Sequence, residues 1–140
     1  MVDFLGREEN ARRSHGLHHI ALGTDDVSRL ARFYCDVLEL PERTRHYTES
    51  GELRSVWLEL GGVLLMIERS EATHARVEGV GAGWFLVAFA VAADEHGELE
   101  ERLRARGVAI ESRTQWTSYA RDPDGNRIAF SAYPLEAPEP

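Results

Sequence analysis

The chain has 140 residues, of which 43% are hydrophobic, so it can bury one sizeable core and we expect one domain. Its formal net charge of -8 argues against nucleic acid or an anionic membrane as a partner, since both need clustered positive charge. No apolar run reaches the roughly 18 residues of a membrane span, no leader opens the chain, and the single cysteine, Cys35, favours a reducing cytoplasm.

The two ends of the chain differ in composition from its middle. Residues 1–14 are polar and predict an N-terminal arm, and residues 135–140 contain two prolines and predict a C-terminal tail. Residues 15–134 between them are expected to form a single domain.

The first half of this domain, residues 15–69, predicts a strand, a helix and three further strands. The strand candidate 17–24 ends at Asp25 and Asp26, which are good N-cap residues. Apolar residues from Val27 to Leu38 then recur at helical spacing. Strand-like runs follow at 43–48, 53–60 and 63–68.

The second half, residues 84–134, repeats this order after a linker of residues 70–83 that is rich in Gly and Ala. A strand is predicted at 84–91, Asp94 is the expected helix cap, and Gly107 occupies a helix C-cap position. Strand candidates follow at 108–112, 118–121 and 127–133. Superposing the first strands of the two halves places His19 on Leu86.

The repeat predicts an α+β fold. Four strands with a helix on one face leave the other face of the sheet without a partner. We therefore expect two tandem βαβββ modules that form a curled mixed sheet around a central cleft.

Two segments carry a resemblance to a known family. His19-Ile-Ala-Leu, followed by Phe33-Tyr34 and Leu38, resembles the opening of the vicinal oxygen chelate proteins, which include glyoxalases, bleomycin resistance proteins and extradiol dioxygenases. Residues 121–126, Arg-Asp-Pro-Asp-Gly-Asn, resemble the turn before their final strand, where Pro, Gly and Asn suit tight turns. The resemblance spans residues 17–133.

The resemblance implies a divalent metal held by a histidine on the first strand and a carboxylate or amide on the last strand of each half. The matching positions are His19, Met66, Leu86 and Ala129, and only the first can donate a lone pair to such an ion. Glu68, two residues past Met66 on the same strand face, is a possible substitute. A catalytic metal usually takes three protein ligands.

Two cofactor hypotheses therefore stay open. Either the cofactor is absent, or one divalent metal ion is held by His19 and Glu68, with His46 as a further candidate. His18 is expected on the opposite face from its neighbour.

The expected cleft defines candidate site residues. His19 is a candidate general base, because imidazole titrates near neutral pH, and Glu68 is its candidate partner; the alternatives are a hydrogen-bonded cavity histidine and a glutamate at the solvent edge. The ligand-binding candidates are His46, Trp57, Met66, Leu86, Trp116, Tyr119, Arg127 and Ala129. Core packing is the alternative for the aromatic residues. Arg127 either binds an anionic group or forms an ion pair with Asp122 or Asp124.

The leading functional hypothesis is a protein that binds a small organic ligand with a degenerate metal site, and either sequesters the ligand or performs metal-free acid/base chemistry. The alternative is a metal-dependent enzyme of the glyoxalase, epimerase or dioxygenase type with a site rebuilt at His19 and Glu68. A homodimer is possible, because the family includes dimers whose clefts combine halves from two chains.

Overall fold

The computed structural model describes residues 16–72 and 75–135, so the predicted arm 1–14 and nearly all of the predicted tail lie outside the described residues. The first module contains β1 (His19–Thr24), α2 (Val27–Leu38), β2 (Glu42–Tyr47), β3 (Leu53–Leu60) and β4 (Val63–Arg69). The second contains β5 (Val87–Ala90), the 3-10 turn η1 (Ala93–Glu95), α3 (His96–Ala105), β6 (Ser112–Arg113), β7 (Thr117–Arg121) and β8 (Arg127–Ser131). No helix within the described part is long and apolar enough to cross a membrane.

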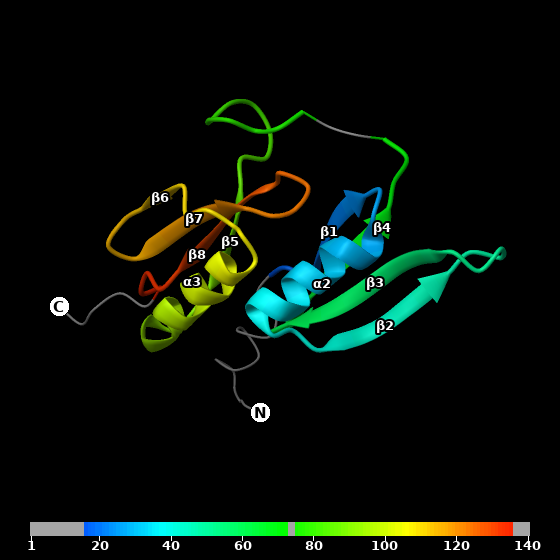
Figure 1. The fold of residues 1–140 in the computed structure, drawn as a ribbon, viewed down its shortest axis with the longest axis horizontal. Helices are drawn as coiled ribbons and strands as arrows, with labels where there is room; N and C mark the ends of the chain where they lie inside the picture. Colours follow the sequence, from blue (N-terminus) through cyan, green and yellow to red (C-terminus); the bar gives the residue numbers. More distant parts are fainter. Residues whose placement is uncertain (1–15, 73–74, 136–140) are drawn as a thin grey trace, which may run out of the picture.

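Both modules have the same sheet topology, which confirms the predicted α+β class and tandem repeat. The strand order is β1-β4-β3-β2 in the first sheet, here sheet A, and β5-β8-β7-β6 in the second, sheet B. In each sheet the first and last strands of the module pair in parallel, and the remaining pairs are antiparallel. Figure 1 shows the two sheets on either side of the helices.

The second module is less regular than its sequence predicts. β5 has four residues and β6 only two. Val108 and Ile110, predicted to lie in a strand, instead pack as partly buried residues against the core. The predicted cap Asp94 lies within η1, and α3 begins only at His96. Gly107 follows α3 with φ 77°, as its predicted place after the helix requires.

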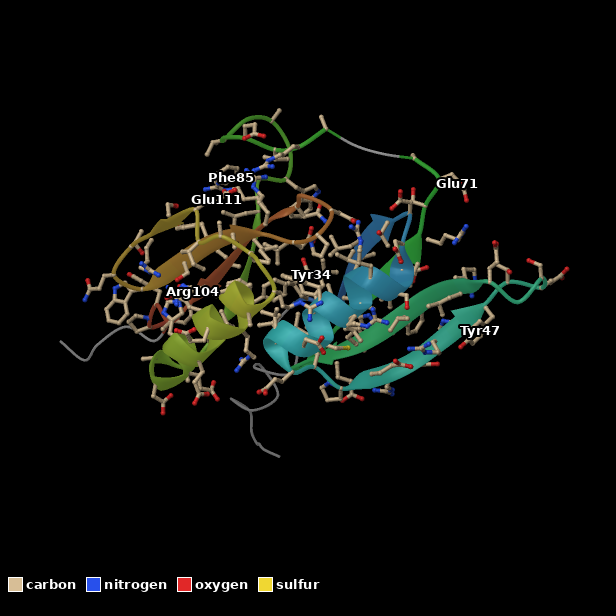
Figure 2. The ribbon with its side chains drawn as sticks, viewed as in Figure 1. Tyr34, Tyr47, Glu71, Phe85, Arg104 and Glu111 are labelled. Carbon is tan, nitrogen blue, oxygen red and sulfur yellow. The ribbon has the colours of Figure 1, made fainter. Side chains whose placement is uncertain are left out.

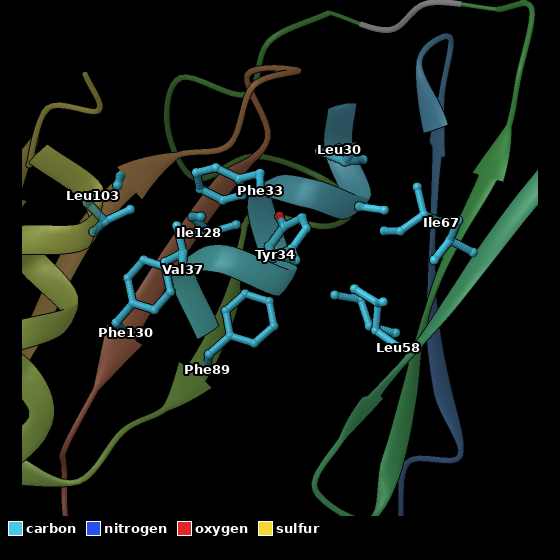
Figure 3. Close-up of a cluster of buried hydrophobic side chains, with 14 of the residues drawn as sticks. Leu30, Phe33, Tyr34, Val37, Leu58, Ile67, Phe89, Leu103, Ile128 and Phe130 are labelled. Carbon is cyan, nitrogen blue, oxygen red and sulfur yellow. The ribbon is translucent and has the colours of Figure 1, made fainter. Parts of the chain in front are cut away.

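Helix α2 lies at the centre of the core. Asp26 caps its first turn by accepting a hydrogen bond from the Arg29 N–H at 3.1 Å. Its buried residues are Val27, Leu30, Ala31, Phe33, Tyr34 and Val37. Figure 3 shows Leu30, Phe33, Tyr34 and Val37 of this helix between side chains of both sheets, with Leu58 and Ile67 on one side and Ile128 and Phe130 on the other.

This position of α2 keeps the two sheets apart. They remain separate four-stranded sheets and do not close into one curled sheet, because the helix stands between them and their apolar faces both pack toward it (Figure 1). The faces that the helices leave open therefore point away from each other. One chain does not enclose the predicted central cleft by itself.

Candidate functional site

The open face of sheet A carries the predicted site residues of the first module. In β1, His19 and Ala21 are exposed, whereas Ile20 and Leu22 pack against the core. The register places Met66 beside Ala21 on one side and Trp57 on the other. Strand alternation puts Glu68 and His46 on this face as well, and both are partly buried.

The register separates His19 from Glu68. His19 pairs with Leu64, and Glu68 lies four residues farther along β4, which is about 13 Å at the rise of a strand. The contact that His19 does make is with His18, whose Nδ1 lies 3.0 Å from its own. The two side chains were expected on opposite faces of the strand, yet their rings meet edge to face with centroids 5.2 Å apart; His18 lies just before β1, which begins at His19.

Glu68 belongs to a different group on the same face. The Trp57 Nε1–H donates a hydrogen bond of 2.9 Å to the Glu68 carboxylate. The ring of His46 lies 4.8 Å from that of Trp57, and its Nδ1 lies 2.7 Å from the hydroxyl of Ser55, which is buried. The face therefore carries a histidine pair at one end and a polar aromatic cluster at the other.

The open face of sheet B carries the site residues of the second module. Tyr119 pairs with Ala129, and Ala129 pairs with Ala88, so the three side chains share one face. The neighbouring residues Ile128 and Phe130 point into the core. Leu86 precedes β5 and has the same parity as Ala88. Both Leu86 and Ala129 thus belong to the face turned away from the helices.

Arg127 shares this face, and its guanidinium lies beside two aromatic rings. Its guanidinium carbon lies 4.5 Å from the ring centroid of Phe85 and 5.3 Å from that of Tyr119. Its Nε is buried and has no hydrogen-bond partner. Phe85 was not among the predicted site residues; it lies where the linker enters sheet B (Figure 2).

The expected ion pair of Arg127 with Asp122 or Asp124 does not form. The Asp122 carboxylate accepts hydrogen bonds from the Tyr34 hydroxyl and the Asn126 side chain, at 2.6 and 2.8 Å. Asp124 pairs with Arg29 at 2.7 Å. Both carboxylates are occupied by groups of α2 and of the turn itself, so Arg127 has no anionic partner among the residues that the structure describes.

Trp116 contributes to the edge of sheet B. It is half-buried, and its ring meets that of Tyr133 edge to face at 6.3 Å. Its contact with a ligand remains a prediction.

A second polar cluster, which the sequence did not indicate, lies on the helix side of sheet B. The Ser118 hydroxyl donates to the Glu100 carboxylate and lies 3.0 Å from His96 Nε2. Arg113 donates two hydrogen bonds to Glu100, at 2.8 and 3.0 Å, and this arginine lowers the pKa of Glu100 to about 2. Ser118 is fully buried, so the cluster joins α3 to β7 and lies on the opposite side of sheet B from Tyr119 and Arg127.

Comparison with known protein families identifies the superfamily of this chain. The sequence model of the Glyoxalase/Bleomycin resistance protein/Dioxygenase superfamily matches residues 16–130. The chain belongs to this superfamily.

Solved structures of other superfamily proteins have the same fold. The fosfomycin resistance protein FosX from Listeria monocytogenes superposes with a TM-score of 0.72 at 22% identity, over 86% of this chain and 93% of that one. FosX from Mesorhizobium loti gives 0.69 at 17% identity, covering 87% and 94%. Lactoylglutathione lyase from Agrobacterium tumefaciens gives 0.60 at 22%, covering 85% and 94%. No curated protein gives a significant match.

The donor set does not fit the metal that the superfamily implies. Of the four matching positions, Met66, Leu86 and Ala129 offer no ligand for a hard or borderline cation. The described residues include no group of three or more His, Cys, Asp or Glu side chains arranged to hold an ion. Of the four superfamily positions, only His19 could bind such a metal, which is fewer than the three protein ligands of a typical catalytic site.

Proposed function

We propose that this protein binds a small organic ligand in a cleft formed by two copies of the chain, without the superfamily's metal. The observation that carries the proposal is the division of the candidate residues between two outward faces. Sheet A presents His19, His46, Trp57, Met66 and Glu68, and sheet B presents Leu86, Tyr119, Arg127 and Ala129. Because α2 fills the space between the sheets, these sets can face each other only across two chains.

The chemistry of the two faces supports ligand binding. The open face of sheet A carries imidazole, indole and carboxylate groups. The open face of sheet B carries aromatic rings, small apolar side chains and one arginine. Ligand pockets combine an apolar lining with a few polar groups in this way. Such a cleft could sequester its ligand in the cytoplasm, or His19 could act on it as a general base.

The relatives support a small ligand in general terms. One Listeria FosX structure contains Mn(II) and 1S,2S-dihydroxypropylphosphonic acid. At 22% identity this likeness establishes the shared fold alone, so the ligand of this chain has to be found by experiment.

Two measurements test the proposal. Light scattering with size-exclusion chromatography should give the mass of a dimer, and a screen of small organic compounds should find ligands that raise the melting temperature, because binding to the folded state stabilises it. His19→Ala and Ala129→Trp should each weaken binding, although they change different faces. A monomeric protein that binds these ligands with full affinity would refute the two-chain cleft.

The metal-dependent enzyme remains a second candidate function because His19 is exposed and its Nδ1 lies beside that of His18, which gives one ion two nitrogen donors. Metal analysis of protein purified without chelators distinguishes the two. Stoichiometric Zn, Mn, Ni or Fe that is lost in His19→Ala would favour this alternative over the metal-free proposal.

A further inference from the structure

Arg127 is a cation with no anion in the described structure. Its neighbour across the strand pair, Arg121, shows the usual arrangement: it forms ion pairs with Glu111 at 3.3 Å and Glu78 at 3.8 Å, and donates to the carbonyl of Gly125. The Arg127 side chain has no ion pair and no hydrogen bond among the described residues, and its Nε is buried. A buried polar group without a partner carries an energetic cost, which a ligand could remove.

The surroundings of Arg127 restrict how a ligand can approach it. Phe85 and Tyr119 lie within cation–π distance of the guanidinium, so they favour its charge and help to hold it in place. Because the two rings lie against the guanidinium and its Nε is buried, its two terminal nitrogens are the part left to bind a ligand. Two parallel N–H groups match the two oxygens of a carboxylate.

Beside the guanidinium the face is apolar. Ala88 is exposed and Leu86 is half-buried, whereas Ala129 between Ala88 and Tyr119 is covered by its neighbours. The accessible side chains Ala88 and Leu86 are apolar and offer no hydrogen bond. A flat apolar group would lie against them and against the ring of Tyr119.

From this geometry we propose that the cleft binds an organic acid, with its carboxylate on Arg127 and a flat apolar body over Ala88 and Leu86. This inference rests on the proposed ligand cleft and names the class of ligand it takes. Arg127 would determine specificity because an uncharged analogue supplies no anion for its guanidinium.

The test compares 2-naphthoate, 2-naphthamide and acetate by isothermal titration calorimetry on the full chain. We expect the naphthoate to bind at least about ten-fold more tightly than the amide, which has the same shape without the charge. Acetate, which lacks the apolar body, should bind more weakly than the naphthoate. Arg127→Gln should remove the preference for the acid over the amide. Arg127→Lys should retain part of this preference, because lysine keeps the positive charge but lacks the two parallel N–H donors of the guanidinium.

The matched control is Arg32→Gln, which removes the same charge from an exposed arginine of α2 with no ion pair among the described residues. It should bind naphthoate as the unchanged protein does, and a circular dichroism spectrum establishes that each variant is folded. Equal binding of acid and amide, or full naphthoate affinity in Arg127→Gln, would overturn the anion proposal while leaving the cleft intact. If neither aromatic compound binds, the acid proposal fails, and the dimer mass decides separately whether the two-chain cleft stands.

Discussion

Tyr34 on α2 donates a hydrogen bond of 2.6 Å to the carboxylate of Asp122, which lies 88 residues away in the turn before β8. Both residues are buried, and burial raises the pKa of Tyr34 well above its usual value. Asp122 also accepts hydrogen bonds from the backbone N–H groups of Asp124 and Asn126, each at 3.0 Å. A single carboxylate thus shapes the turn and joins it to the helix of the other module.

Tyr34→Phe should therefore destabilise the protein although it keeps the ring in the core. The variant removes one hydrogen bond to a buried charge, which corresponds to a loss of about 1.5–3 kcal/mol in the free energy of unfolding. Urea denaturation measures this loss. Tyr133→Phe is the control, since that ring is 62% exposed, and it should change stability by less than about 0.5 kcal/mol. An equal effect of the two variants would contradict the role of the Tyr34–Asp122 bond.

The cap of α2 gives a second prediction with an adjacent control. Asp26→Ala removes the side chain that accepts from the Arg29 N–H, and we expect a loss of about 1 kcal/mol. Asp25→Ala makes the same substitution one residue earlier, at an exposed residue with no hydrogen bond in the described structure, and should be nearly neutral. If both variants melt at the temperature of the unchanged protein, the cap contributes nothing.

The Glu100 cluster predicts acid sensitivity. The folded state holds the pKa of Glu100 at about 2, below the ordinary carboxyl value, through the hydrogen bonds from Arg113 and then from Ser118. The resulting stabilisation is complete above the ordinary carboxyl pKa and is lost as the pH falls toward 2. Glu100→Gln should therefore reduce stability at pH 7 by about 1–3 kcal/mol.

The difference between Glu100→Gln and the unchanged protein should shrink as the pH falls from about 4.5 toward 2. Denaturation at a series of pH values tests this. Glu101→Gln serves as the control because Glu101 is 75% exposed and pairs only with Arg104. A destabilisation by Glu100→Gln that is the same at pH 7 and pH 3 would show that the charge of Glu100 is not its source.

The sequence predicted the elements whose patterns are local. The spacing of Val27 to Leu38 and the cap at Asp26 gave α2 closely, and the run 53–60 matches β3 residue for residue. The short strands of the second module were overestimated, because Val108 and Ile110 are apolar for packing against the core and form no strand pairs. An apolar run alone does not distinguish a strand from a loop whose side chains pack against the core.

The arrangement of the site was harder to predict because it depends on the packing of the modules. Strand parity alone predicted that Leu86, Arg127 and Ala129 share one face of their sheet, and the strand pairing gives Arg127 and Ala129 a common face in β8. Strand parity did not reveal that α2 would fill the space between the sheets. Nor did it indicate the contact of Arg127 with Phe85, since that residue lies ahead of β5 and outside its pairing.

The degenerate donor set leads to a final prediction, in which the missing ligands are restored. If two copies form the cleft, Leu86→His together with Ala129→Glu places two donors opposite His19 of the other copy, which completes the three ligands of a typical catalytic metal site. Ala129 is 1% exposed, so the new carboxylate should lower the melting temperature without metal, and Mn²⁺ or Zn²⁺ should restore it. Calorimetry should find about one ion for each chain.

The matched control pairs Leu86→His with Ala90→Glu, which puts the carboxylate on the same face of β5 but about 13 Å from residue 86. This variant should bind no stoichiometric metal. Adding His19→Ala to the restored pair should also abolish binding, and it should do so although His19 lies on the other sheet of its own chain. Metal binding that persists without His19 would mean that the two open faces do not meet, and the two-chain cleft would have to be abandoned.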